Sequence, residues 1–200
     1  MERFSGVHLL AVPSGRTVRR LAGAAVVAAL AAAALEAKVY LTQEEALRLA
    51  FPGATVERRT AFLTEAQRRQ AQKLSGDDSL PAALVSFYVA RKDGREVGTA
   101  YFDTHVVRTM PETILVVVDP AGALGRVEVL SFSEPEEYLP RARWYAQFPG
   151  KPLDSELSLK RGVRPVVGAT LTARATTAAA RRVLALHRVL PATTPRAPVP

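Results

Sequence analysis

The sequence contains no cysteine and only three histidines among its 200 residues. Without cysteine, the chain cannot form disulfides, hold an iron–sulfur cluster through thiolates or use a thiol nucleophile. The three histidines, His8, His105 and His187, lie far apart in the sequence, so no metal site is predicted. No catalytic residue is predicted either. Any redox chemistry of this chain must therefore come from a bound cofactor.

Acidic residues are in the minority, with 19 Asp and Glu against 27 Lys and Arg, a net charge of +8. Such an excess favours an anionic partner. The chain lacks the aromatic and basic motifs of the known RNA and DNA modules, so no nucleic-acid partner is expected. Residues 38–190 carry 22 basic and 17 acidic groups, an excess that suits an anionic cofactor or a lipid surface.

The longest stretch without charge is residues 21–35, which follows four arginines and one glutamate in residues 1–20. A helix of that length would span about 22 Å, less than the ~30 Å core of a bilayer. The basic start, the short apolar run and the small residues at 32–37 are typical of an export signal. An uncleaved anchor and a buried alanine-rich helix are the alternatives. We predict a signal peptide or membrane anchor at residues 1–37, with the following domain on the extracytoplasmic (periplasmic) side of the cell membrane.

Residues 38–190 are predicted to form one α+β domain. Capping boxes starting at Thr42 and Thr64 predict helices reaching Ala50 and Leu74, a third helix is expected over 171–190, and residues 134–148 are expected to be helical in one or two pieces. Four strands are predicted at 83–90, 96–102, 113–119 and 125–132. Consecutive antiparallel strands indicate a curved antiparallel sheet with flanking helices. The proline-rich residues 191–200 are predicted to be a disordered tail.

The segment Val166-Val167-Gly168-Ala169-Thr170-Leu171-Thr172 leads into the last predicted helix. A glycine allows close approach of a ligand, and a helix N-terminus favours a phosphate. The hydroxyl of Thr170 could be esterified by that phosphate and hold a cofactor permanently. The alternative is that Gly168 only makes a tight turn and that Thr170 or Thr172 caps the helix.

Two motifs carry a resemblance to a known family: Gly168-Ala169-Thr170-x-Thr172, and Trp144 followed by Gln147-Phe148-Pro149-Gly150-Lys151. Together with the order of the segments, they resemble the covalent-FMN-binding domain family, which includes the exported flavin subunits of Rnf-type complexes and of the sodium-translocating NADH:quinone reductase. The resemblance implies an FMN site at residues 168–172, with a flavin transferase attaching FMN through its phosphate to Thr170. Val167 replaces the family's usual Ser or Thr, and Arg164 replaces an acidic residue; Arg164 could pair with the phosphate of a non-covalent FMN.

A second polar cluster, residues 103–113, lies between two predicted strands. Arg108 could face the flavin phosphate or its pyrimidine end, and His105 and Thr109 could hydrogen-bond its carbonyls. The alternative is a solvated loop with a weak surface pair between Arg108 and Glu112. Asp103 and His105 share one face of a strand and invite a hydrolase hypothesis with a serine, but no nucleophile-elbow motif accompanies them.

Aromatic and basic residues outside these motifs have simpler interpretations. Trp144 and Tyr145 are expected in the core or partly buried at the surface, with stacking on a flavin as the alternative. Arg181, Arg182 and Arg188 are expected on a solvated helix face, and His187 is expected to be structural or exposed.

The expected function is that of an exported, membrane-associated FMN-binding electron-transfer protein. No dinucleotide-binding motif is present, so the chain is expected to act with other subunits of a membrane redox complex and not as a stand-alone enzyme. The alternative is a flavin-free accessory module of an envelope redox complex that retains the fold.

Overall fold

The computed structural model describes residues 38–77 and 83–190, all within one compact unit, Ala37–Pro200. The predicted signal or anchor at residues 1–37 and the predicted tail at 191–200 lie outside the described residues. Among the helices that are described, none is both long enough and apolar enough to cross a membrane.

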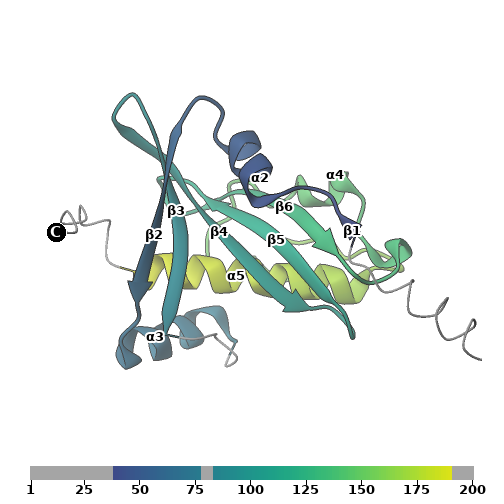
Figure 1. The fold of residues 1–200 in the computed structure, drawn as a ribbon. Helices are drawn as coiled ribbons and strands as arrows, with labels where there is room; N and C mark the ends of the chain where they lie inside the picture. The colour runs from purple at the N-terminus through teal and green to yellow at the C-terminus, as the bar shows by residue number, and fades with distance from the viewer. Residues whose placement is uncertain (1–37, 78–82, 191–200) are drawn as a thin grey trace, which may run out of the picture. The chain divides into compact units, whose positions relative to one another are not determined.

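A six-stranded antiparallel sheet forms the centre of the domain, with the strand order β1-β6-β5-β4-β3-β2 (Figure 1). The predicted α+β class, with an antiparallel sheet and flanking helices, is therefore confirmed. The sheet has two more strands than predicted, β1 and β2. The strands are β1 (Lys38–Val39), β2 (Thr55–Phe62), β3 (Leu84–Lys92), β4 (Arg95–Val106), β5 (Pro111–Val118) and β6 (Leu124–Phe132).

The two additional strands lie at the two edges of the sheet. β2 has the sequence TVERRTAF, and none of its residues is fully buried, so its apolar pattern is too weak to indicate a strand. β1 is only two residues long. By contrast, the hairpin between β3 and β4 follows from its turn residues: Asp93 and Gly94 both have positive φ, 52° and 76°, as a two-residue primed turn requires.

The helices begin close to where their start signals lie. α2 (Gln43–Ala50) and α3 (Glu65–Ser75) each carry the predicted capping box, from Thr42 and Thr64. The last helix, α5, covers Thr170–Val189. Residues 134–148 form two short pieces, a 3-10 helix η1 (Glu136–Tyr138) and α4 (Ala142–Tyr145), because Pro140 interrupts the segment between them.

The sheet carries helices on both faces. On one face, Ile114 and Val116 belong to the same apolar cluster as Val183 of α5 and Ala71 of α3. On the other face, Leu115 and Val117 of β5 cluster with Ala46 and Phe51 of the α2 segment. Successive residues of β5 point to opposite faces, which explains why this strand is an unbroken apolar run. The long helix α5 thus has one side against the sheet (Figure 1).

Candidate functional site

The turn before α5 projects from the surface of the domain. Val167 is 102% exposed, Gly168 has a φ of +83°, and Thr170 is the first residue of the helix. The hydroxyl of Thr170 is exposed and donates a hydrogen bond to the Val166 carbonyl at 2.9 Å. The tight turn at Gly168 is confirmed. Capping by Thr170 or Thr172 is wrong, because the cap residue is Ala169 and no side chain caps the helix.

The start of α5 differs from the starts of α2 and α3. Both shorter helices have a side-chain cap and an acidic residue in the first turn, whereas α5 has neither. The first backbone N–H groups of α5 and the positive end of its helix dipole therefore have no capping side chain among the described residues.

Thr172 and Leu171 have different environments although both lie in the first turn of α5. Leu171 is 47% exposed, whereas Thr172 is completely buried. The Thr172 hydroxyl donates a hydrogen bond to the carbonyl of Tyr138 in η1. The Arg108 guanidinium lies over the Tyr138 ring, 4.5 Å from its centroid. The structure therefore brings Arg108, from the second predicted cluster, to the same corner as Thr172.

Glu134 holds the β4–β5 turn in place. Its carboxylate accepts hydrogen bonds from the backbone N–H groups of Thr109 at 2.7 Å and Met110 at 2.9 Å. It also accepts one from the Thr109 hydroxyl at 3.2 Å. These bonds, above all the one from the Thr109 backbone, lower the pKa of Glu134. Thr109 is thus committed to the turn.

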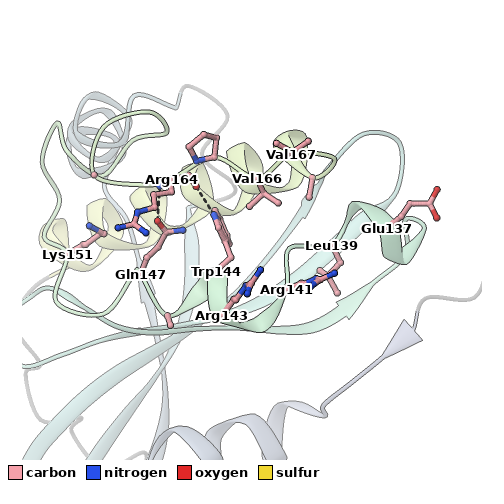
Figure 2. Close-up of a pocket in the computed structure, with 14 residues that line it drawn as sticks. Glu137, Leu139, Arg141, Arg143, Trp144, Gln147, Lys151, Arg164, Val166 and Val167 are labelled. Carbon is pink, nitrogen blue, oxygen red and sulfur yellow. Dashed lines mark hydrogen bonds between the residues drawn. The ribbon is translucent and has the colours of Figure 1, made fainter.

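A cavity of about 900 Å³ lies beside the turn, between α4 and residues 162–169 (Figure 2). We call it the Trp144 cavity. Four basic side chains line it with a single acid, Glu137, and none of these five forms an ion pair with a described residue. The basic residues are Arg141, Arg143, Lys151 and Arg164. The cavity is therefore suited to an anionic ligand.

Trp144 and Gln147 build the wall of this cavity. Trp144 is only 8% exposed and packs edge-on against Tyr145 and Phe148. Its indole N–H donates to the Arg164 carbonyl at 2.7 Å, and the Gln147 side chain accepts from the Arg164 backbone N–H at 2.8 Å. The core position expected for Trp144 is confirmed. The Trp144 indole N–H and the Gln147 side-chain oxygen together hold the backbone of Arg164 at the edge of the cavity.

Thr170 lines a different cavity. This second cavity, about 910 Å³, lies along α5 and is lined by Thr170, Arg174 and Arg181 together with Lys160 and Arg161. We call it the Arg174 cavity. Pro165 lines both cavities, whereas Val166, Val167 and Ala169 line only the Trp144 cavity. The turn before α5 thus stands between two basic cavities.

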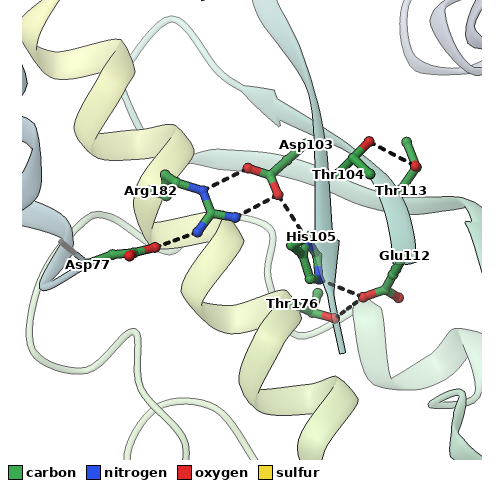
Figure 3. Close-up of polar contacts among 8 residues, drawn as sticks. All are labelled: Asp77, Asp103, Thr104, His105, Glu112, Thr113, Thr176 and Arg182. Carbon is green, nitrogen blue, oxygen red and sulfur yellow. Dashed lines mark hydrogen bonds and ion pairs between the residues drawn. The ribbon is translucent and has the colours of Figure 1, made fainter. Parts of the chain in front are cut away.

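His105 lies in a buried network of charged groups beneath α5 (Figure 3). Its Nδ1 is 2.9 Å from Asp103 Oδ1 and its Nε2 is 2.9 Å from Glu112 Oε2. Burial by itself would lower the pKa of His105, but the hydrogen bonds to the two carboxylates outweigh it and raise the pKa to about 9. At neutral pH the ring is therefore an imidazolium that donates to both carboxylates.

Arg182 extends the network to Asp77, which follows the end of α3. Its guanidinium donates two hydrogen bonds to Asp103, at 2.9 and 2.7 Å, and another to Asp77. The expectation of a solvated face is therefore wrong for Arg182, which is buried. Arg181 is half-buried and donates hydrogen bonds to the carbonyls of Ser75 and Leu157. Only Arg188 is exposed as expected.

The strand register explains the partners of His105. Asp103 and His105 share one face of β4 as predicted, and Glu112 lies directly opposite His105 on β5. The Glu112 carboxylate is buried and also accepts from Thr176 at 3.2 Å. The alternative of a weak surface pair between Glu112 and Arg108 is therefore wrong. His187 is structural, since its Nδ1 lies 2.9 Å from the Tyr101 hydroxyl.

Several residues of the two cavities were not among the predicted site residues, notably Arg141, Arg143, Lys160 and Arg174. A local signal was present in the sequence. Residues 139–190 contain ten Lys and Arg but only two acids, whereas residues 38–138 contain 12 basic and 15 acidic residues. The positive charge of the domain is thus concentrated in the segment that builds both cavities.

Models of known protein families and curated protein sequences provide no match to this chain. The assignment of function therefore rests on the residues and their geometry.

Proposed function

We propose that this chain binds FMN at the N-terminal end of α5 and transfers electrons through it. The observation that carries the proposal is the Trp144 cavity, where four basic side chains without ion-pair partners among the described residues lie beside the turn before α5. Its volume of about 900 Å³ is within the ~300–1,000 Å³ typical of small-molecule sites. Size and charge together suit an anionic mononucleotide.

The residues around the cavity fit FMN in two respects. The backbone of Arg164 is held at the edge of the cavity by Trp144 and Gln147, and its exposed side chain would supply a cation for the phosphate or the electron-rich pyrimidine end of a flavin. The cations beside it, Arg141 and Arg143, add positive charge that would favour an anionic ring. Bound FMN supplies one- or two-electron transfer, and the protein's part is to hold and orient it.

Thr170 is the residue that could hold FMN covalently. Its hydroxyl is exposed and donates a hydrogen bond to the Val166 carbonyl, so the oxygen is accessible to an enzyme. In the proposed step, Thr170 Oγ1 forms a bond to the phosphorus of an activated flavin phosphate. The hydroxyl proton passes to a base of the flavin transferase, and the donor's leaving group departs from phosphorus. A flavin transferase would catalyse this step.

The cellular setting of the proposal comes from the sequence. We propose that residues 1–37 direct export or anchor the chain, which places the domain at the extracytoplasmic side of the membrane. The partners would be other subunits of a membrane redox complex. With no cysteine in the chain, the flavin would be its sole redox group.

A flavin-free accessory module is the second candidate, and two residues favour it. Val167 and Arg164 both lie exposed at the turn, where a flavin transferase would have to recognise the chain. Loss of that recognition would leave the fold intact, because neither side chain contributes to the core.

Titration of the flavin-free full-length chain with FMN tests the proposal, with quenching of flavin fluorescence as the signal. We expect saturable binding in the micromolar range or tighter. Arg164→Gln should weaken it about tenfold, since a charge-assisted contact contributes roughly 1.5–3 kcal/mol. Arg91→Gln is the matched control, because Arg91 is an exposed arginine of β3 away from both cavities. A folded chain that does not bind FMN would support the flavin-free module instead.

Covalent attachment is tested by co-expression with a flavin transferase. We expect the intact mass to increase by one FMN residue in the wild-type chain and to stay unmodified in Thr170→Val. An unmodified wild-type chain that still binds FMN reversibly would show that the site is non-covalent.

A further inference from the structure

We infer that the flavin phosphate is bound in the Arg174 cavity, with Arg174 as its principal cation and Lys160 and Arg161 as secondary ones. This inference rests on the proposed function and deepens it, because it divides the cofactor between the two sides of the turn. The ring would belong to the Trp144 cavity and the phosphate to the Arg174 cavity.

The position of Thr170 is the first argument. Thr170 lines the Arg174 cavity and not the Trp144 cavity. Arg174 is four residues further along α5, so it lies on the same face of the helix, one turn away. A phosphate close to the Thr170 oxygen, whether esterified or free, would therefore be within reach of the Arg174 side chain.

The charges of the cavity are the second argument. Arg174, Lys160 and Arg161 are exposed and have no ion-pair partner among the described residues. The one acid that lines the cavity, Asp77, is already paired with Arg182. The remaining charge is therefore positive, and guanidinium groups match the geometry of phosphate oxygens.

The walls of the cavity are held in place by hydrogen bonds. Arg181 donates to the carbonyls of Ser75 and Leu157 and thereby joins α5 to the end of α3 and to the loop that carries Lys160. Asp154 accepts from the backbone N–H groups of Glu156 at 2.8 Å and Leu157 at 3.1 Å within the same loop. A cavity organised before binding loses less entropy when a ligand enters.

The test uses the full-length chain, inorganic phosphate followed by phosphorus NMR line width, and FMN followed by fluorescence. We expect phosphate to bind and to compete with FMN in the wild-type chain. Arg174→Gln should weaken both ligands about tenfold. Arg188→Gln is the matched control, because it removes an exposed arginine of the same helix that lines neither cavity, and it should bind both ligands as the wild type does.

The outcomes separate this inference from the proposed function. FMN binding that is unaffected by Arg174→Gln, or phosphate that binds without competing with FMN, would overturn the inference and leave FMN binding intact. Phosphate binding that depends on Arg174, in a chain that does not bind FMN, would overturn the flavin assignment. If Arg174→Gln and Arg188→Gln weakened ligand binding equally, the loss would reflect the net charge of the chain. That result would contradict a specific phosphate site at Arg174.

Discussion

Arg182 and Arg174 belong to the same helix, eight residues apart, yet their surroundings are opposite. Arg182 is buried and donates to two carboxylates, Asp103 and Asp77. Arg174 is exposed at a cavity and has no ion-pair partner among the described residues. The same residue type therefore serves the fold at one position and is available to a ligand at the other.

The difference extends to the groups around each arginine. Around Arg182, the carboxylates of Asp77, Asp103 and Glu112 and the cations of Arg182 and His105 form one largely buried network. Around Arg174, the exposed cations Lys160 and Arg161 line the same cavity, and its one acid among the described residues, Asp77, is paired with Arg182. Breaking a buried pair leaves a charge without compensation, whereas an exposed cation costs little to remove. Substitutions should therefore divide into those that affect stability and those that affect binding.

The largest effect is expected for Arg182→Gln. It removes the hydrogen bonds of the guanidinium to Asp103 and Asp77 and leaves His105 as the cation beside Asp103. Because Arg182 and Asp103 are largely buried, the free energy of unfolding should fall by about 3–5 kcal/mol. Urea denaturation provides the measurement. Arg174→Gln should change the same quantity by less than about 0.5 kcal/mol. A small effect of Arg182→Gln would show that the network contributes little to the fold.

The next effect is the pH dependence caused by His105. Its pKa is raised from the ordinary value of 6.5 to about 9 in the folded state, so the folded chain binds more protons than the unfolded chain between these pH values. The stabilisation is complete below pH 6.5 and is lost as the pH rises through about 9, a change of about 3 kcal/mol.

Denaturation at several pH values between 6.5 and 9 measures this loss. His105→Gln should flatten the slope. The pKa of His187 is lowered, mainly by burial. His187 therefore changes the stability only at pH values below 6.5, outside the range in which His105 acts. An equally steep slope in His105→Gln would assign the pH dependence to other groups.

The smallest effect distinguishes the two threonines at the start of α5. Thr172→Val removes the buried hydrogen bond to the Tyr138 carbonyl and should cost about 1–2 kcal/mol of stability. Thr170→Val removes only an exposed bond and should cost less than about 0.5 kcal/mol, although it would abolish covalent attachment. If the two variants lost the same stability, the different surroundings of these hydroxyls would have no energetic consequence.

Much of the fold follows from local signals in the sequence. The capping boxes at Thr42 and Thr64 and the Asp93-Gly94 turn involve residues close together in the chain, so their geometry is predictable. The edge strand β2 was missed because its polar side chains face solvent on both faces of the sheet. Its assignment depends on pairing with β3, which local sequence does not contain.

The candidate site was predictable only in part. The turn at Gly168 and the start of α5 were found from a short motif. The pairing of His105 with Glu112 depends on the register of β4 against β5, and that of Arg182 with Asp77 joins residues 105 positions apart. Such contacts arise from tertiary packing, so a run of arginines on one helix does not reveal which of them is buried.

The most direct test of the account compares the affinity of the full-length chain for FMN with its affinity for riboflavin, which lacks the phosphate. If the cations without partners at the start of α5 bind the flavin phosphate, FMN should bind at least about tenfold more tightly. Equal affinities, or a folded chain that binds neither flavin, would contradict the account.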